Sequence, residues 1–98
     1  MVLKAFSPVM EHTRITFELP SSLWADRVFV VGDFNHWSQT STPLTQARDG
    51  AWRATLDLPI GKQYHFYYLI NGRSHADNQA DGFANAEREF PTSLIKLG

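Results

Sequence analysis

Turn-forming residues divide this chain into short segments along nearly its whole length, roughly every 8–12 residues. Within 13–19 and 52–58, apolar and polar residues alternate with a period of two, which is typical of strands with one buried face. Asn71 and Gly72 form the preferred pair for a two-residue hairpin turn, because both positions need a positive φ. No stretch of about 12 residues carries the apolar stripe of a helix. The pattern therefore predicts an all-β protein.

Two further segments are apolar nearly throughout and predict more deeply placed strands. The segment 27–32 is short and rich in β-branched residues, as in a central strand covered on both faces. In 63–70 both sets of alternating side chains are largely apolar, so one face must be exposed or covered by a ligand or partner. Residues 77–89 are polar and predict a loop, and 92–97 predicts a closing strand.

The length of 98 residues allows one domain rather than two. A chain of this size with strands and no helices buries its apolar faces by packing two antiparallel sheets together. We therefore expect a single domain over residues 1–98, an all-β antiparallel sandwich of roughly six to eight short strands. Residues 1–11 are expected to form an irregular lead-in, with room for a short edge strand.

The composition argues against several classes of function. The net charge is −1 and the nine basic residues are scattered, so the chain lacks the basic surface that binds nucleic acid or an anionic membrane. The aromatic content of 13% suits base stacking in a single-stranded nucleic-acid binder, but such a protein also needs a basic groove. The chain has no cysteine, no apolar run of membrane length and no signal-peptide pattern. We expect a soluble, cytoplasmic protein.

The sequence gives little support for catalysis or for metal binding. The four histidines have no recognised ligand spacing, and the glycines are spread as turn markers rather than gathered in a phosphate loop. A glycosidase needs two carboxylates flanking a cleft, which a sandwich this small scarcely offers. We expect a non-catalytic domain without a metal or cofactor.

Trp37 is the strongest candidate for a binding residue. It lies in a polar turn directly after an apolar strand, where a large aromatic has no evident role in the core. A flat indole suits the apolar C–H face of a sugar ring. The alternative is that Trp37 plugs one end of the sandwich. Its neighbours have other expected roles: Phe34 in the core, Asn35 as a turn former and His36 facing solvent.

The other two tryptophans receive different interpretations. Trp52 is in register with the apolar residues of 52–58, so we expect it in the core. Trp24 precedes a strand, and the sequence leaves its role open. One interpretation is that its side chain covers the edge of the sandwich.

The segment Gly32–Trp37 reads Gly-Asp-Phe-Asn-His-Trp and resembles the strand–G–x–F–N–x–W signature of the family 48 carbohydrate-binding modules. That family includes the isoamylase-type N-terminal early set domains and the glycogen-binding domain of the AMP-activated protein kinase beta subunit. Further similar motifs follow in the family's order, at 43–44, 49–52, 56–61, 66–72 and 75–81. The resemblance implies an immunoglobulin-like β-sandwich that binds α-1,4-glucan or oligosaccharide of the glycogen or starch type, with catalysis left to a separate barrel domain.

The resemblance also implies a set of sugar-contacting positions. Trp37 matches the tryptophan that stacks on glucose, and Tyr67 occupies the position of a sugar-contacting lysine in the kinase domain. The alternative is that Tyr67 is an ordinary cross-strand aromatic. Thr92 falls near a late asparagine that contacts sugar there. In the sugar-binding hypothesis, His36 and the loop Ser74–Asn78 complete a shallow site.

One departure from the family pattern lies at Ser74, where the kinase domain has a second platform tryptophan. Losing one of two rings is worth about 1–3 kcal/mol, so we expect weak binding. The departure also motivates an alternative, in which the sandwich is a protein-interaction domain that does not bind sugar. Its partner would then be a glycogen-metabolism protein or a second copy of the chain.

Overall fold

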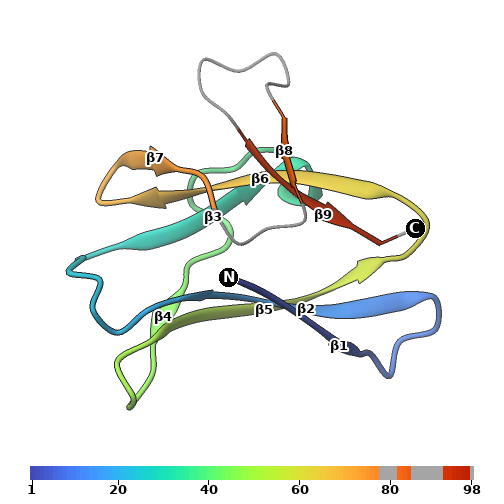
Figure 1. The fold of residues 1–98 in the computed structure, drawn as a ribbon, viewed down its shortest axis with the longest axis horizontal. Coiled ribbons are helices and arrows are strands. Elements are labelled where there is room, and N and C mark those ends of the chain that lie inside the picture. The colour runs from blue at the N-terminus through green and yellow to red at the C-terminus, as the bar shows by residue number, and fades with distance from the viewer. Residues whose placement is uncertain (78–81, 85–91, 98) are drawn as a thin grey trace.

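In the computed structural model, which describes residues 1–77, 82–84 and 92–97, two antiparallel sheets face each other (Figure 1). The lower sheet in that view has the order β1-β2-β5-β4, formed by Val2–Phe6, His12–Leu19, Trp52–Pro59 and Thr45–Gln46. The upper sheet has the order β3-β6-β9-β8, formed by Val28–Gly32, Gln63–Ile70, Thr92–Lys96 and Gly82–Ala84. A further strand, β7 (Arg73–His75), pairs with the end of β6. The predicted all-β sandwich is confirmed.

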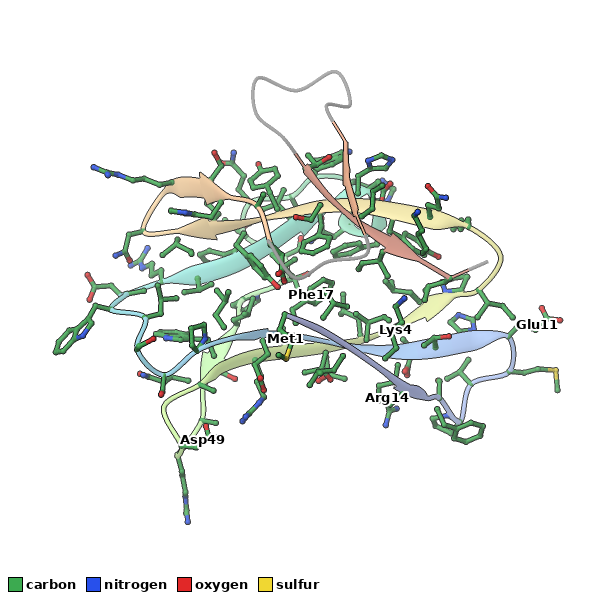
Figure 2. All side chains as sticks on the ribbon, viewed as in Figure 1. Met1, Lys4, Glu11, Arg14, Phe17 and Asp49 are labelled. Carbon is green, nitrogen blue, oxygen red and sulfur yellow. The ribbon has the colours of Figure 1, made fainter. Side chains whose placement is uncertain are left out.

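The core lies between the two sheets and follows the alternation of the strands. Ile15 and Phe17 of β2 are fully buried, as is Phe66 of β6. The Phe17 ring, which Figure 2 shows between the sheets, meets the rings of Phe66 and Tyr68 edge to face, with centroids 5.1 and 6.4 Å apart. Pairs of this geometry add about 0.5–1.5 kcal/mol to the effect of buried area. Trp52 belongs to the same buried cluster, as predicted.

Strand β3 lies at the edge of its sheet, so the prediction of a central strand over 27–32 is wrong. Its second edge is nevertheless hydrogen-bonded, because a loop runs beside it. The backbone N–H of Val30 donates to the carbonyl of Thr42 at 3.0 Å, and that of Leu44 donates to the carbonyl of Val28 at 2.8 Å. This backbone edge is therefore paired by the loop and not by a neighbouring strand, while the predicted burial on both faces is seen in Val30, which lies in the core, and in Val31, which is buried outside it.

Two other expectations change with the structure. The described residues form nine strands rather than roughly six to eight, because β4 is only two residues long and β8 lies within the predicted loop 77–89. The short edge strand for which the predicted lead-in 1–11 left room is present as Val2–Phe6, paired with β2. Trp24 does not cover the edge of the sandwich, since its side chain is 94% exposed.

Helical structure in the described part of the chain is limited to the 3-10 helix Asp33–Asn35 (η1). This agrees with the absence of a helical stripe in the sequence. Among the residues that the structure describes, no helix is long and apolar enough to cross a membrane.

A polar cluster links the two sheets beside the core. The Met1 ammonium group, which precedes β1, contacts the buried carboxylate of Asp77, which follows β7. The Tyr68 hydroxyl donates to that carboxylate at 2.7 Å, and the Asp77 backbone N–H donates to Ser93 Oγ at 2.6 Å. Burial, together with the nearby Asp77 charge, raises the pKa of Tyr68 far above its ordinary value.

Candidate functional site

The segment from Gly32 to Trp37 leaves β3 in a tight turn. After η1, His36 and Trp37 both have a φ of 58°, in the left-handed region that residues with a Cβ seldom adopt. The backbone N–H of Trp37 donates back to the carbonyl of Gly32 at 2.8 Å. Gly32 is needed there, because a Cβ would lie 2.6 Å from the carbonyl oxygen of His65. The sequence therefore holds the backbone under Trp37 in one conformation.

The side chain of Asn35 fixes this turn from the inside. Its Oδ1 accepts the Gly32 N–H at 3.1 Å, and its Nδ2 donates to the Val30 carbonyl and to Thr42 Oγ1, both at 3.1 Å. The turn is thereby bonded both to β3 and to the loop beside it. The prediction that Asn35 is a turn former is confirmed, although its side chain bonds to neighbouring residues and not to its own backbone, and the left-handed φ values fall on His36 and Trp37.

The two aromatic residues of the turn point to opposite sides of the upper sheet. The Phe34 ring lies against the core, stacked on Phe17 with ring centroids 5.5 Å apart. The Trp37 ring stacks instead on Tyr67, with centroids 6.1 Å apart and an interplanar angle of 21°. Trp37 does not belong to the buried core cluster, so the structure does not place it as a plug between the sheets.

The upper sheet carries a second apolar layer on its outer face, the face turned away from the core. By strand alternation and register this outer face comprises Phe29, Val31, His65, Tyr67, Leu69, Thr92 and Leu94. Val31 and Tyr67 are paired across the strands and are 0% and 4% exposed, although neither belongs to the core. Trp37 is half-buried and stacks on the Tyr67 member of this pair. The predicted need for a cover over one face of 63–70 is met in part by Trp37.

The structure brings several of the predicted site residues together at this face. Trp37 and Tyr67 are in contact, and His36 is exposed beside Trp37 in the turn. Thr92 is fully buried, with its Oγ1 3.5 Å from Nδ1 of His65. Tyr67 lies beneath Trp37, so it presents little of its own ring to a ligand.

The remaining two predicted residues lie elsewhere or outside the description. Ser74 of β7 is exposed and is the register partner of Leu69, farther along the outer face from the Trp37 stack. Asn78 falls outside the described residues. Sequence reasoning did not single out Phe29, His65 or Leu69, although their outward positions follow from the alternation of 27–32 and 63–70.

The charged groups whose pKa values are shifted by ion pairs lie away from this face. Arg14 and Asp57 form a two-point contact on the lower sheet at 3.1 and 3.2 Å, which raises the pKa of Arg14 and lowers that of Asp57. Arg53 likewise lowers the pKa of Asp49 through its hydrogen bonds to that carboxylate. Figure 2 shows that Arg14 and Asp49 lie on the side of the lower sheet that faces away from the upper sheet.

Among the described residues no three His or acidic side chains are grouped to hold a metal. The arrangement at Trp37 is suited to stacking and hydrogen bonding.

The sequence of this chain is similar to a known protein family and to parts of known enzymes. The family model described as Carbohydrate-binding module 48 (Isoamylase N-terminal domain) matches residues 6–84, which include the turn and both strands under Trp37. The 1,4-alpha-glucan branching enzyme of Aquifex aeolicus is 34% identical over 73 residues, covering 72% of this chain and 11% of the enzyme. That of Oceanobacillus iheyensis is 35% identical over 80 residues, covering 76% and 12%. The chain thus corresponds to a small part of these relatives' length.

Proposed function

Because the chain belongs to the carbohydrate-binding module 48 family, we propose that it is a non-catalytic module for glycogen- or starch-like α-1,4-glucan. A glucose ring stacks on Trp37. The relatives named above are 1,4-alpha-glucan branching enzymes, which favours this glucan among carbohydrates. In them the matching segment is a small part of a longer chain, and we propose that this domain acts by itself or as a small adaptor.

The observation that carries the proposal is the way Trp37 is held. Its backbone is in a left-handed conformation, and its ring rests on the buried Tyr67 and not in the core. A large ring fixed at the surface loses little entropy when a ligand stacks on it. The polar residues of the turn, with His36 exposed beside Trp37, suit the hydroxyl groups at the edges of a sugar.

Binding is expected to be weak, since Ser74 stands where the family's kinase member has a second platform ring. One missing ring corresponds to about 1–3 kcal/mol, or roughly a tenfold to hundredfold difference in affinity. An assay that concentrates many binding sites in a matrix therefore suits this protein.

Affinity electrophoresis in native gels containing glycogen tests the proposal. The wild-type protein should be retarded, and Trp37→Ala should migrate as it does in a gel without glycogen. Ile60→Ala is the control, because Ile60 is an apolar residue 50% exposed in the bend after β5, away from Trp37. Unretarded wild type, or equal retardation of Trp37→Ala, contradicts the proposal.

A protein-interaction role is the second candidate, and exposed apolar side chains around the β1–β2 turn favour it. Phe6 is 90% exposed and Met10 is 85% exposed. The partner is a second copy of the chain or a glycogen-metabolism protein. Sedimentation velocity separates a self-associating protein from a monomer, and a Phe6→Ala change should shift the distribution only if this turn forms the contact.

A further inference from the structure

A surface hollow of about 500 Å³ lies at the other end of β3 from Trp37. Its volume is in the range of small-ligand sites, about 300–1,000 Å³. The hollow is lined by Asp26, Arg27, Phe29, Leu69, Asn71 and Gly72. It therefore combines an apolar floor from two strands with a polar rim from two turns, which is the lining expected for an amphipathic ligand such as a sugar.

The floor of the hollow continues the surface on which Trp37 rests. Phe29 and Leu69 are register partners, and Val31 and Tyr67 form the next pair on the same face. Same-face neighbours along a strand are about 7 Å apart. A linear chain held at Trp37 and running along β3 therefore reaches the hollow without leaving the sheet.

The small side chain of Ser74 keeps the floor open. Ser74 is the register partner of Leu69, and directly opposed side chains on one face of a sheet lie in contact range. A large ring at position 74 would lie beside Leu69 and occupy that space. Phe29 and Leu69 instead remain half-buried, with apolar surface left for a ligand.

Asn71 holds the backbone of the rim in place before any ligand binds. Its Oδ1 accepts the backbone N–H groups of Asp26 at 2.8 Å and Arg27 at 3.2 Å, and its own N–H donates to the Arg27 carbonyl at 2.9 Å. These bonds join the β6–β7 hairpin turn to the segment that enters β3. The exposed side chains of Asp26 and Arg27, which extend from this hydrogen-bonded backbone, offer an acceptor and donors for hydroxyl groups.

Trp24 lies two residues before this rim, and its side chain is 94% exposed. Single exposed apolar residues are common, but an almost fully exposed indole two residues along the chain from the rim of a hollow offers a large surface for stacking. Two residues span at most about 7 Å of chain, so the indole is within reach of a ligand at the rim.

We propose that this hollow, with Trp24 at its entrance, is a second subsite that binds glucose units farther along the same α-1,4-glucan chain. The proposal rests on the proposed function, because it takes the ligand at Trp37 to be such a glucan. Short oligosaccharides occupy the Trp37 platform alone. Longer ones extend along β3 over Phe29 and Leu69 and contact Arg27 and Trp24.

Isothermal titration with maltotriose and maltoheptaose tests the subsite. Trp24→Ala and Arg27→Ala should each weaken binding of maltoheptaose, by about tenfold for the indole, and leave maltotriose within about twofold of wild type. Trp37→Ala should weaken both sugars. Ile60→Ala should change neither, because Ile60 is half exposed in the bend after β5 and belongs to neither proposed contact, and Trp24 is so exposed that Trp24→Ala should fold normally.

Failure of the subsite is distinguishable from failure of the proposed function. If Trp37→Ala weakens both sugars while Trp24→Ala and Arg27→Ala bind both as wild type does, the second subsite is contradicted and the proposed function stands. Equal weakening of both sugars by Trp24→Ala also contradicts a subsite reserved for longer chains. If the wild-type protein binds neither sugar, the proposed function is contradicted and the subsite with it.

Discussion

The indole of Trp37 lies nearly parallel to the ring of Tyr67, with centroids 6.1 Å apart and an interplanar angle of 21°. Tyr67 is 4% exposed and Trp37 is half-buried above it. The lower ring therefore supports the upper one, and the outer part of the pair is the indole. Tyr67 therefore acts as a support for Trp37, and its own ring face does not stack on the ligand.

Changes at Tyr67 separate support from direct contact. Tyr67→Phe keeps the ring under Trp37 and should bind maltotriose within about twofold of wild type, whereas Tyr67→Ala should weaken binding about as much as Trp37→Ala. Isothermal titration measures both. If Tyr67→Phe loses binding while its thermal unfolding is unchanged, the hydroxyl contacts the sugar directly, and the supporting role is contradicted.

The turn under Trp37 depends on Asn35. Asn35→Ala removes three hydrogen bonds of 3.1 Å and leaves the Gly32 N–H and the Val30 carbonyl without that partner. We expect a loss of about 1–3 kcal/mol in the free energy of unfolding. Urea unfolding checks this value.

Asn35→Asp is the matched variant, since it keeps the acceptor for the Gly32 N–H and removes both donors. It should fall between wild type and Asn35→Ala. Equal stability of wild type and Asn35→Ala would show that the turn does not depend on this side chain.

The sequence predicted the fold well where the determining interactions are local. Alternation over 13–19 and 52–58 and the Asn71-Gly72 turn gave strands β2 and β5 and the β6–β7 hairpin close to their observed limits. The edge position of β3 was not predictable in this way. Which strand lies beside another is set by contacts far apart in the sequence, and here a loop takes the place of a neighbour.

The candidate site was predicted less completely than the fold. Trp37 stood out because a large aromatic in a polar turn is unusual, and the family motif supported it. The burial of Tyr67 depends on how the turn bends the Trp37 ring over the sheet, which requires the left-handed backbone at 36 and 37. The exposure of Trp24 depends on the path of a loop that no periodic pattern specifies.

Ser74→Trp tests the missing second ring. A tryptophan at this position should strengthen binding of maltoheptaose, which is long enough to reach both rings, by roughly tenfold to a hundredfold, because stacking on a second ring is worth about 1–3 kcal/mol. Isothermal titration against the wild type provides the measurement, with Ser74→Ala as the control for loss of the hydroxyl group. Unchanged binding of maltoheptaose in Ser74→Trp would contradict a second stacking position at residue 74.

The buried hydroxyl of Tyr68 predicts a specific response to alkaline pH. Its pKa is raised in the folded state, mainly by burial and also by Asp77, whereas an unfolded tyrosine ionises near pH 10. Above about pH 10 the unfolded chain therefore loses this proton while the folded chain keeps it, so the free energy of unfolding falls as pH rises.

Thermal unfolding of wild type and Tyr68→Phe between pH 8 and pH 11 checks this response. At pH 8 the variant should be less stable by about 1–3 kcal/mol, because the Asp77 carboxylate loses a buried donor. The difference should shrink as pH rises above about 10. A constant difference across the range would rule out the Tyr68 ionisation as its source.

The central claim is that a glucose ring stacks on Trp37, and the indole N–H signals of the three tryptophans report on it separately. In a two-dimensional ¹H–¹⁵N NMR titration with maltotriose, the signal that disappears in Trp37→Ala should shift with sugar concentration. The signal of the core residue Trp52 should stay in place. A titration that leaves the Trp37 signal unmoved at saturating sugar, or that moves Trp52 instead, contradicts the account.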